Sequence, residues 1–140
     1  MNIVLDSNIL FSALIKDSLT RKMIILHTEI LLFPSVIFDE MEKHKGELLR
    51  KSEMNIEQFE TLLEILLHNV QIIPTDILRP YKKKAYDLVK DIDPDDALII
   101  ACALAYPRSI LWSDDKKLKQ QSIVTVVNTT EMYQLFYGAL

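Results

Sequence analysis

Residues 93–112 read DPDDALIIACALAYPRSILW, in which an acidic segment precedes two apolar runs. The first run, Ala97–Ala105, is apolar at every position and rich in alanine, which favours a helix that is buried on most sides. The second run, Ser109–Trp112, has the length and composition of a short strand. We therefore expect the helix, which begins near Pro94, to pack directly on a sheet that contains this strand.

The rest of the chain alternates short β-like runs with longer helical ones. The further expected strands are Asn2–Leu5, Glu29–Phe33, Val70–Ile73 and Ile123–Val127. The further expected helices are Ile9–Lys16, Thr20–Thr28, one capped by Ser35 after Pro34, Asn55–Asn69, one from Ile77 or Pro80 to Lys90, Lys116–Gln121 and Thr130–Tyr137. This order predicts a three-layer α/β/α fold with a central parallel sheet of about five strands.

The composition limits both the number of domains and the kinds of chemistry. With 140 residues and 49% hydrophobic composition, the chain can bury one core, so we expect residues 1–140 to form a single domain. Only two glycines are present, which excludes glycine-rich phosphate loops, dinucleotide fingerprints and the Gly-x-Ser-x-Gly elbow. The three histidines form no zinc motif, and we expect the single cysteine, Cys102, to be a small buried hydrophobe. Carboxylates are the chemistry that remains.

Membrane insertion and export are not expected. No uninterrupted apolar run reaches the length of a membrane span, and Met1–Asp6 lacks the basic-then-apolar pattern of a signal peptide. We expect a soluble, cytoplasmic protein without membrane association.

Four short acidic segments lie where expected strands end or expected helices begin. They are Asp6-Ser7-Asn8, Asp39-Glu40, Asp93-Pro94-Asp95-Asp96 and Asp114-Asp115. In a parallel α/β sheet, residues that follow different strands meet at the carboxyl edge, and a helix that precedes a strand starts at that same edge. Carboxylates gathered at one place need protons or a cation, and hard oxygen ligands suit Mg²⁺ or Mn²⁺. This pattern indicates phosphodiester chemistry.

Each acidic segment also fits a purely local role. Asp93 suits a helix cap with Pro94 in the first turn, and the acids that follow suit the helix dipole. Asp6 fits a turn that leaves a strand, and Ser113 fits a second cap. Glu40 alone fits a solvated helix face. The metal hypothesis therefore depends on all four segments reaching one edge of the sheet.

The motifs and their order resemble those of the PIN-domain ribonucleases, many of which are VapC-like toxins of prokaryotic toxin–antitoxin pairs. The similarity covers essentially the whole chain and rests on four short elements. They are Val4-Leu5-Asp6-Ser7-Asn8, Ser35 with Glu40, Asp93-Pro94-Asp95-Asp96-Ala97-Leu98-Ile99, and Ser113-Asp114-Asp115-Lys116, where serine replaces the family's threonine. The resemblance implies that the catalytic acids and ligands of Mg²⁺ or Mn²⁺ are Asp6, Glu40, Asp96 and Asp115. It gives supporting roles to Asn8, Ser113 and Asp93.

The resemblance implies an Mg²⁺- or Mn²⁺-dependent endoribonuclease that cleaves RNA, and a toxin role would add an antitoxin protein as partner. A homodimer is expected from the family and from the broad apolar stripe on Asn55–Asn69. A catalytically silent PIN-like module that binds RNA or protein remains the alternative. Neighbouring acids also remain open as ligands, namely Asp95 or Asp93 beside Asp96, and Asp114 beside Asp115. A phosphotransferase with Asp6 as nucleophile is disfavoured, because Asn8 stands where such enzymes commonly carry a second acid.

The net charge of −4, from 16 basic and 20 acidic residues, is unusual for a protein that binds nucleic acid. Metal bound at the acidic segments would neutralise part of this charge. The bases nearest to the predicted edge are Lys116, Lys117 and Lys119, with Lys43 and Lys45 farther along the helix that carries Glu40. Two interpretations of these lysines stay open, a guide for RNA and, with the greater weight, ordinary solvated helix faces. We expect the binding of RNA to be weak and sensitive to salt.

Overall fold

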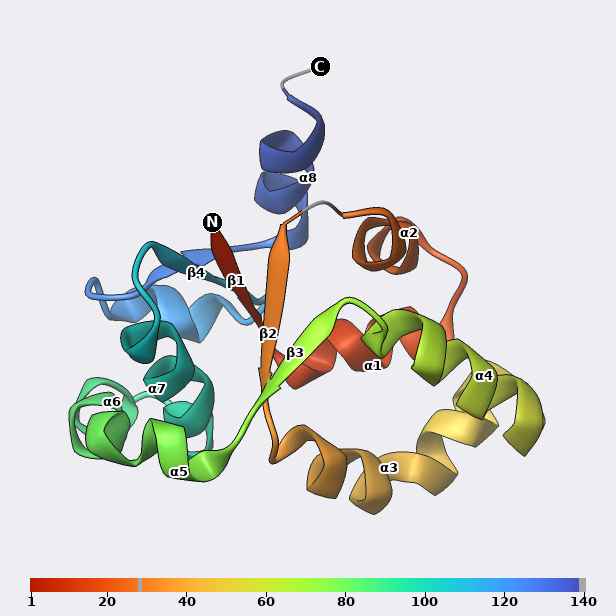
Figure 1. The fold of residues 1–140 in the computed structure, drawn as a ribbon, viewed down its shortest axis with the longest axis horizontal. Helices are drawn as coiled ribbons and strands as arrows, with labels where there is room; N and C mark the ends of the chain where they lie inside the picture. The colour runs from red at the N-terminus through yellow and green to blue at the C-terminus, as the bar shows by residue number, and fades with distance from the viewer. Residues whose placement is uncertain (28, 139–140) are drawn as a thin grey trace.

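The computed structural model describes residues 1–27 and 29–138. At its centre is a sheet of five parallel strands in the order β3-β2-β1-β4-β5 (Figure 1). The strands are β1 (Asn2–Leu5), β2 (Ile30–Pro34), β3 (Val70–Ile73), β4 (Ser109–Trp112) and β5 (Thr125–Val127). The first strand of the chain is therefore the central one. The predicted three-layer α/β/α fold with a parallel sheet is confirmed.

Helices cover both faces of this sheet (Figure 1). Packed against one face are α1 (Ser7–Ile15), α2 (Leu19–Leu26), α3 (Ile37–Ser52), α4 (Ile56–Leu67) and α8 (Thr129–Tyr137). Packed against the other are α5 (Thr75–Leu78), α6 (Lys82–Val89) and α7 (Ala97–Ala105). Short 3₁₀ helices lie at η1 (Arg79–Tyr81), η2 (Pro94–Asp96) and η3 (Lys116–Gln120). The predicted end of the second helix, Thr28, lies outside the described residues.

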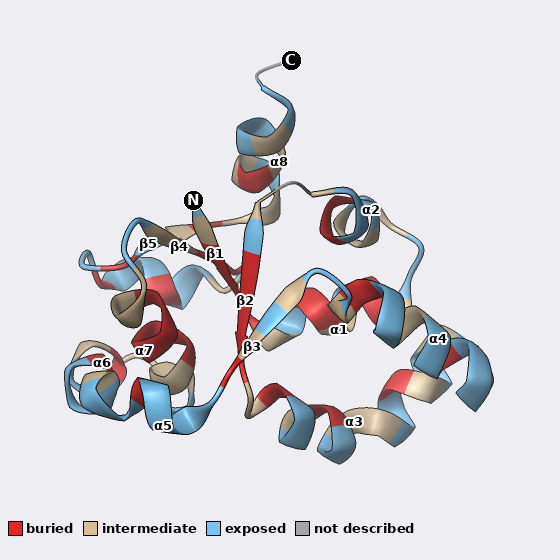
Figure 2. Ribbon diagram, viewed as in Figure 1, coloured by how far each residue is buried: buried red, intermediate tan, exposed pale blue. Residues whose placement is uncertain are grey.

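Side chains of the strands alternate between two hydrophobic cores. On β1, Ile3 and Leu5 enter the core beneath α1 to α4, whereas Val4 enters the core beneath α7. The same alternation separates Leu31 from Leu32 on β2. The inner strands are consequently buried along most of their length (Figure 2). Because both faces are covered, these strands are continuously apolar, as is typical of parallel sheets.

Helix α7 is the buried helix that the sequence predicts. Ile100, Ala101 and Cys102 are fully buried, and burial raises the pKa of the Cys102 thiol to about 12. The helix contacts β1, β2 and β4 on one side and α6 on the other. Among the described residues, no helix is long and apolar enough to cross a membrane. Since α7 begins directly after Asp96, its packing on the sheet fixes the position of that carboxylate.

One predicted helix cap is wrong. Ser35 does not cap α3, whose cap position is occupied by Val36 without a side-chain hydrogen bond. Instead, the backbone N–H of Ser35 donates to the carbonyl of Ile73 at 2.8 Å, and its hydroxyl lies 3.4 Å from that of Thr75. Ser35 thus continues the hydrogen bonding of β2 with β3, and its hydroxyl lies beside Thr75 instead of capping α3.

The last strand begins two residues later than predicted, at Thr125. The cause is the buried side chain of Gln121, which donates to the carbonyls of Leu118 and Val124 and accepts from the backbone of Ile123 and Val124. These bonds satisfy the backbone of the loop in place of a neighbouring strand. The chain therefore turns through residues 121–124 before it pairs with β4.

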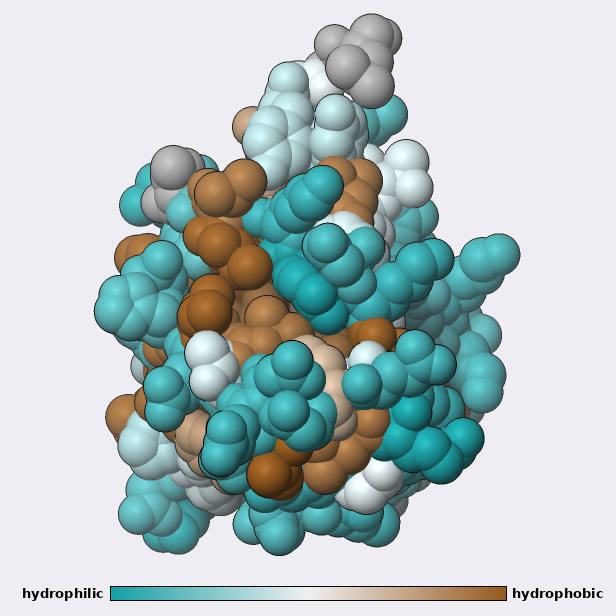
Figure 3. Space-filling view, turned by 90° about the vertical axis from the view of Figure 1, so that its right-hand side faces the viewer, coloured by the Kyte–Doolittle hydropathy of each residue, from teal (hydrophilic) through white to brown (hydrophobic). Residues whose placement is uncertain are grey.

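Most of the apolar stripe of α4 packs in the hydrophobic core. Phe59 and Leu66 are buried in the core, whereas Ile56 and Ile65 are 44% and 48% exposed. Ile65 shares a shallow hollow with Ile25 of α2. Figure 3 shows hydrophobic side chains gathered on this side of the molecule. Part of the stripe is therefore still available for a contact with another chain.

Candidate metal centre

The carboxylate of Asp6 lies at the end of the central strand and is 4% exposed. The backbone N–H of Asp6 continues the ladder by donating to the carbonyl of Trp112 at 3.0 Å. Its Oδ2 accepts a hydrogen bond of 2.7 Å from the buried Ser113 hydroxyl. Its Oδ1 has only long contacts, 3.5 Å each, from the Ser7 hydroxyl and the Asn8 backbone N–H. One oxygen of Asp6 is therefore fixed, and the other is only weakly engaged.

Ser113 also contacts the segment that carries Asp115. The Ser113 hydroxyl accepts from the backbone N–H of Asp115 at 3.1 Å while it donates to Asp6. Asp115 caps η3, because its Oδ1 accepts from the backbone N–H of Lys117 at 3.0 Å. A single hydroxyl thus joins the ends of β1 and β4 and sets the separation of two acids.

The acidic segment before α7 reaches the same edge of the sheet. Asp93 caps η2 by accepting from the backbone N–H of Asp95 at 3.2 Å, as its sequence context predicts. Carboxylate oxygens of Asp93, Asp96 and Asp115 lie within 4.8 Å of one another. Three acids from two segments of the chain therefore meet at one point.

Asp96 also faces a cleft of about 440 Å³ that extends to the start of α3. Asp6 and the half-buried Glu40 line this cleft with it. The structure therefore brings the four sequence-predicted acids to one edge of the sheet, with Asp6, Glu40 and Asp96 around the cleft and Asp115 beside Asp96. Asn8 lines the cleft with an exposed side chain, and it reaches Asp6 only through its backbone N–H.

The acids of this edge raise one another's proton affinity. Burial, followed by the charges of Asp6, Asp93, Asp115 and Glu40, raises the pKa of Asp96 to about 7. Burial also raises the pKa of Asp6, with a further contribution from Asp115 and an opposing one from the Ser113 hydrogen bond. Such a site takes up either protons or a cation. Carboxylate oxygens at this spacing fit a hard divalent cation such as Mg²⁺ or Mn²⁺.

The two neighbouring aspartates have different surroundings. Both oxygens of Asp114 accept hydrogen bonds from Thr129, one from the backbone N–H at 2.7 Å and one from the hydroxyl at 2.9 Å. Asp114 is thus engaged at the start of α8, and Asp115 is the member of this pair that lies in the cluster. Asp95 is exposed and lines the cleft beside Asp96.

Two ring-bearing residues of the cleft are absent from the sequence prediction, namely Phe11 and His44. The spacing could have identified them, because Phe11 lies three residues after Asn8 on α1 and His44 lies four residues after Glu40 on α3. Residues at these separations share one face of a helix. Single histidines and phenylalanines form no motif by themselves. Their spacing from Asn8 and Glu40 becomes informative only after those residues have been assigned to the site.

The lysines of this edge divide into two groups. Lys43 lines the cleft, and Lys116 lines a separate hollow that Asp115 and Lys119 also border. By contrast, Lys119 forms an ion pair with Glu131, and Lys45 lies 3.6 Å from Glu60 of α4. Lys43 and Lys116 are therefore better placed than Lys45 and Lys119 to meet a phosphate.

Known proteins share the family and the fold of this chain. The family model of the PIN domain matches residues 4–135. Among solved structures, a chain of the crystal structure of VapBC2 from Rickettsia felis, bound to a DNA fragment from their promoter, has a similar fold with a TM-score of 0.68 and 21% sequence identity. That match covers 91% of this chain and 98% of the other. No curated protein sequence gave a significant match. Because the family model matches nearly the whole chain, this chain belongs to the PIN domain family.

Proposed function

We propose that residues 1–140 act as one nuclease domain, a metal-dependent endoribonuclease that cleaves phosphodiester bonds in single-stranded or exposed RNA. The observation that carries this proposal is the meeting of Asp93, Asp96 and Asp115, whose carboxylate oxygens lie within 4.8 Å, beside the cleft that Asp6 and Glu40 line. Membership of the PIN domain family supports it.

The ligands in this proposal are Asp6, Glu40, Asp96 and Asp115, with Asp93 in support. A divalent cation held by them, Mg²⁺ or Mn²⁺, would supply Lewis-acid stabilisation of charge on the phosphate oxygens and lower the pKa of the attacking water. The Ser113 hydroxyl holds Oδ2 of Asp6 by a hydrogen bond. Oδ1 has only long contacts, so it is the oxygen that would meet the cation.

RNA would reach this centre despite the net charge of −4. Binding of the cation offsets the charge of the acids, and Lys43 and Lys116 line hollows that these acids border. Because these contacts are electrostatic, RNA affinity should fall as salt rises.

We further propose a cytoplasmic toxin with an antitoxin protein as partner. This rests on fold similarity to a chain from VapBC2 of Rickettsia felis, in a crystal structure that also contains promoter DNA. A homodimer is proposed from the exposed apolar side chains of α2 and α4.

The test is cleavage of a mixed RNA substrate by the purified protein with Mg²⁺ or Mn²⁺, with and without excess EDTA. The expected result is cleavage that stops in EDTA and falls by more than the ~10–100-fold typical of outer-shell changes in Asp6→Asn. Asp87→Asn, an exposed aspartate on α6, is the matched control and should cut normally. Undiminished cutting in EDTA would falsify the metal mechanism. Folded protein that cuts no RNA with either cation would favour a silent binding module.

A further inference from the structure

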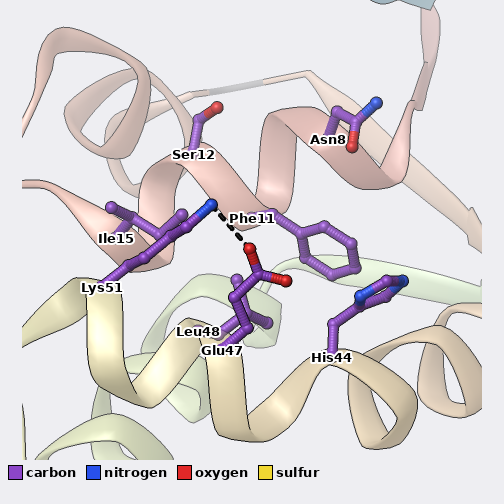
Figure 4. Close-up of a pocket in the computed structure, with 8 residues that line it drawn as sticks. All are labelled: Asn8, Phe11, Ser12, Ile15, His44, Glu47, Leu48 and Lys51. Atoms are coloured by element: carbon purple, nitrogen blue, oxygen red, sulfur yellow. Dashed lines mark ion pairs between the residues drawn. The ribbon is translucent and has the colours of Figure 1, made fainter.

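A second hollow, of about 380 Å³, opens between α1 and α3 beside the acidic cleft (Figure 4). Its walls are two rows of side chains at helical spacing. The row on α1 is Asn8, Phe11, Ser12 and Ile15, and the row on α3 is His44, Glu47, Leu48 and Lys51.

The hollow adjoins the acidic cleft. Asn8, Phe11 and His44 line both of them. His44 follows Glu40 by four residues, so it lies one turn, about 6 Å, farther along the same face of α3. A chain that leaves the acids along this face therefore meets His44 and Phe11 first.

The junction of the two spaces is aromatic. The rings of Phe11 and His44 come from opposite helices, with centroids 5.7 Å apart and planes inclined by 59°. His44 is half-buried, and Phe11 packs against the core at the edge of the hollow. Aromatic side chains at such positions offer faces on which unpaired bases stack.

The part of the hollow farther from the acidic cleft combines apolar side chains with one ion pair. Ile15 and Leu48 provide apolar surface. The carboxylate of Glu47 lies 2.8 Å from the ammonium group of Lys51, and this hydrogen bond lowers the pKa of Glu47 (Figure 4). The two charges offset each other, so the hollow differs from the acidic cleft in suiting a base better than a cation.

We propose that this hollow, defined by Phe11 and His44 with Asn8 and Ser12 at its rim, is a nucleotide subsite. It takes the unpaired base next to the scissile bond, which stacks on the two rings. The proposal rests on the proposed function and deepens it, because a base held here must be out of a duplex. Cleavage is thereby restricted to single-stranded RNA.

The first test is a metal-free NMR titration that follows the ring Cε1–H signals of the histidines, with His44 assigned by His44→Gln. Adenosine 5′-monophosphate should shift the His44 signal saturably and leave that of His68, at the end of α4, unchanged. Ribose 5-phosphate, which has the sugar and phosphate without the base, should shift neither. A silent His44 ring, or an equal response to ribose 5-phosphate, overturns the subsite.

The second test measures binding of a short single-stranded RNA in EDTA by fluorescence anisotropy. Phe11→Leu and His44→Gln should each weaken binding about 5- to 150-fold, the range expected for loss of one base–aromatic stack. Tyr86→Leu, which removes an exposed ring on α6, should bind as the unaltered protein does. Unchanged affinity in both hollow variants contradicts the proposal.

The outcomes distinguish a failure of the subsite from a failure of the proposed nuclease function. RNA cleavage with Mn²⁺ together with a silent His44 ring would leave the nuclease standing and remove the subsite. A His44 response without any RNA cleavage would keep the subsite as a nucleotide-binding site and remove the nuclease.

Discussion

The hydroxyl of Ser113 makes two hydrogen bonds within the candidate site. It donates to Asp6 and accepts from the backbone of Asp115, and it is buried, so water does not replace either bond. A buried polar group that loses its partner costs more free energy than the bond itself contributes. The position of Asp6 should therefore depend on this residue more than on Asn8, whose side chain is exposed.

Replacement of Ser113 by alanine should lower the affinity for Mn²⁺ by about 10- to 100-fold, because Asp6 loses the bond that orients it. Isothermal titration calorimetry measures this affinity. Ser113→Thr retains the hydroxyl and should bind Mn²⁺ nearly as well as the unaltered protein, and Ser122→Ala, at an exposed serine, is the neutral control. Equal affinity in Ser113→Ala and the unaltered protein would show that Asp6 needs no such support.

Asp96 should make the stability of the metal-free protein depend on pH. Its pKa is about 7 when folded, against an ordinary value of 3.8, so between these limits the folded state keeps a proton that the unfolded state has released. The free energy of unfolding therefore falls as pH rises from about 4 to 7. We expect the metal-free melting temperature to decrease across this interval.

Asp96→Asn should flatten this pH dependence without abolishing it, since the raised pKa of Asp6 acts in the same direction. Thermal melts in EDTA from pH 4.5 to 8 measure the slope. Addition of Mn²⁺ should stabilise the protein most at the alkaline end, where the acids are ionised. An identical slope in Asp96→Asn would rule out Asp96 as its source.

At the scale of the elements, adjacent aspartates after β4 act on different parts of the fold. Asp114 accepts from the first residue of α8, and Asp115 caps η3 and contributes an oxygen to the acidic cluster. Adjacent residues in an extended segment point in opposite directions, which separates a helix contact from a candidate ligand.

Asp114→Asn and Asp115→Asn should consequently have opposite effects. Asp114→Asn keeps one oxygen for the Thr129 N–H but loses the acceptor of the Thr129 hydroxyl, so it should reduce stability by about 1 kcal/mol, the usual contribution of one hydrogen bond, and leave Mn²⁺ affinity unchanged. Asp115→Asn should weaken Mn²⁺ binding and change the melting temperature of the metal-free protein little or upward, since it removes a repelling charge. Urea unfolding and calorimetry on both variants provide the comparison. Loss of metal affinity in Asp114→Asn alone would exchange the two assignments.

Most elements could be predicted from the sequence because their signals are local. The all-apolar run Ala97–Ala105 indicates a buried helix, and Asp93-Pro94 is a sufficient signal for the start of η2. The role of Ser35 could not be predicted, since it is set by pairing with Ile73, 38 residues later along the chain. The bond from Ser113 to Asp6 and the Phe11–His44 contact likewise depend on how distant segments pack, which periodicity does not encode.

At the scale of the whole molecule, part of the exposed apolar surface lies on the side of α2 and α4 (Figure 3). Its most exposed members are Leu26 at 67%, Leu19 at 49% and Ile65 at 48%. The sequence predicted an apolar stripe on α4 but not how much of it the core would take. Burial of Phe59 and Leu66 leaves a smaller surface, shared with α2, for a second chain.

Ile65→Lys should shift the protein from dimer to monomer, because a charge at the centre of an apolar contact is costly to bury. Light scattering at high protein concentration measures the mass. Lys84→Glu, at an exposed site on α6, is the control for a change of surface charge and should remain dimeric. An unaltered protein that is monomeric at high concentration would remove the dimer proposal.

The central position of β1 has a consequence for synthesis. The carboxylate of Asp6 obtains its partner hydroxyl from Ser113, 107 residues later, and β1 pairs with β4 before that serine. A ribosome must therefore release most of this chain before the acids can assemble. Nascent or prematurely ended chains should consequently lack the acidic cluster, which forms only after Ser113 and Asp115 have left the ribosome.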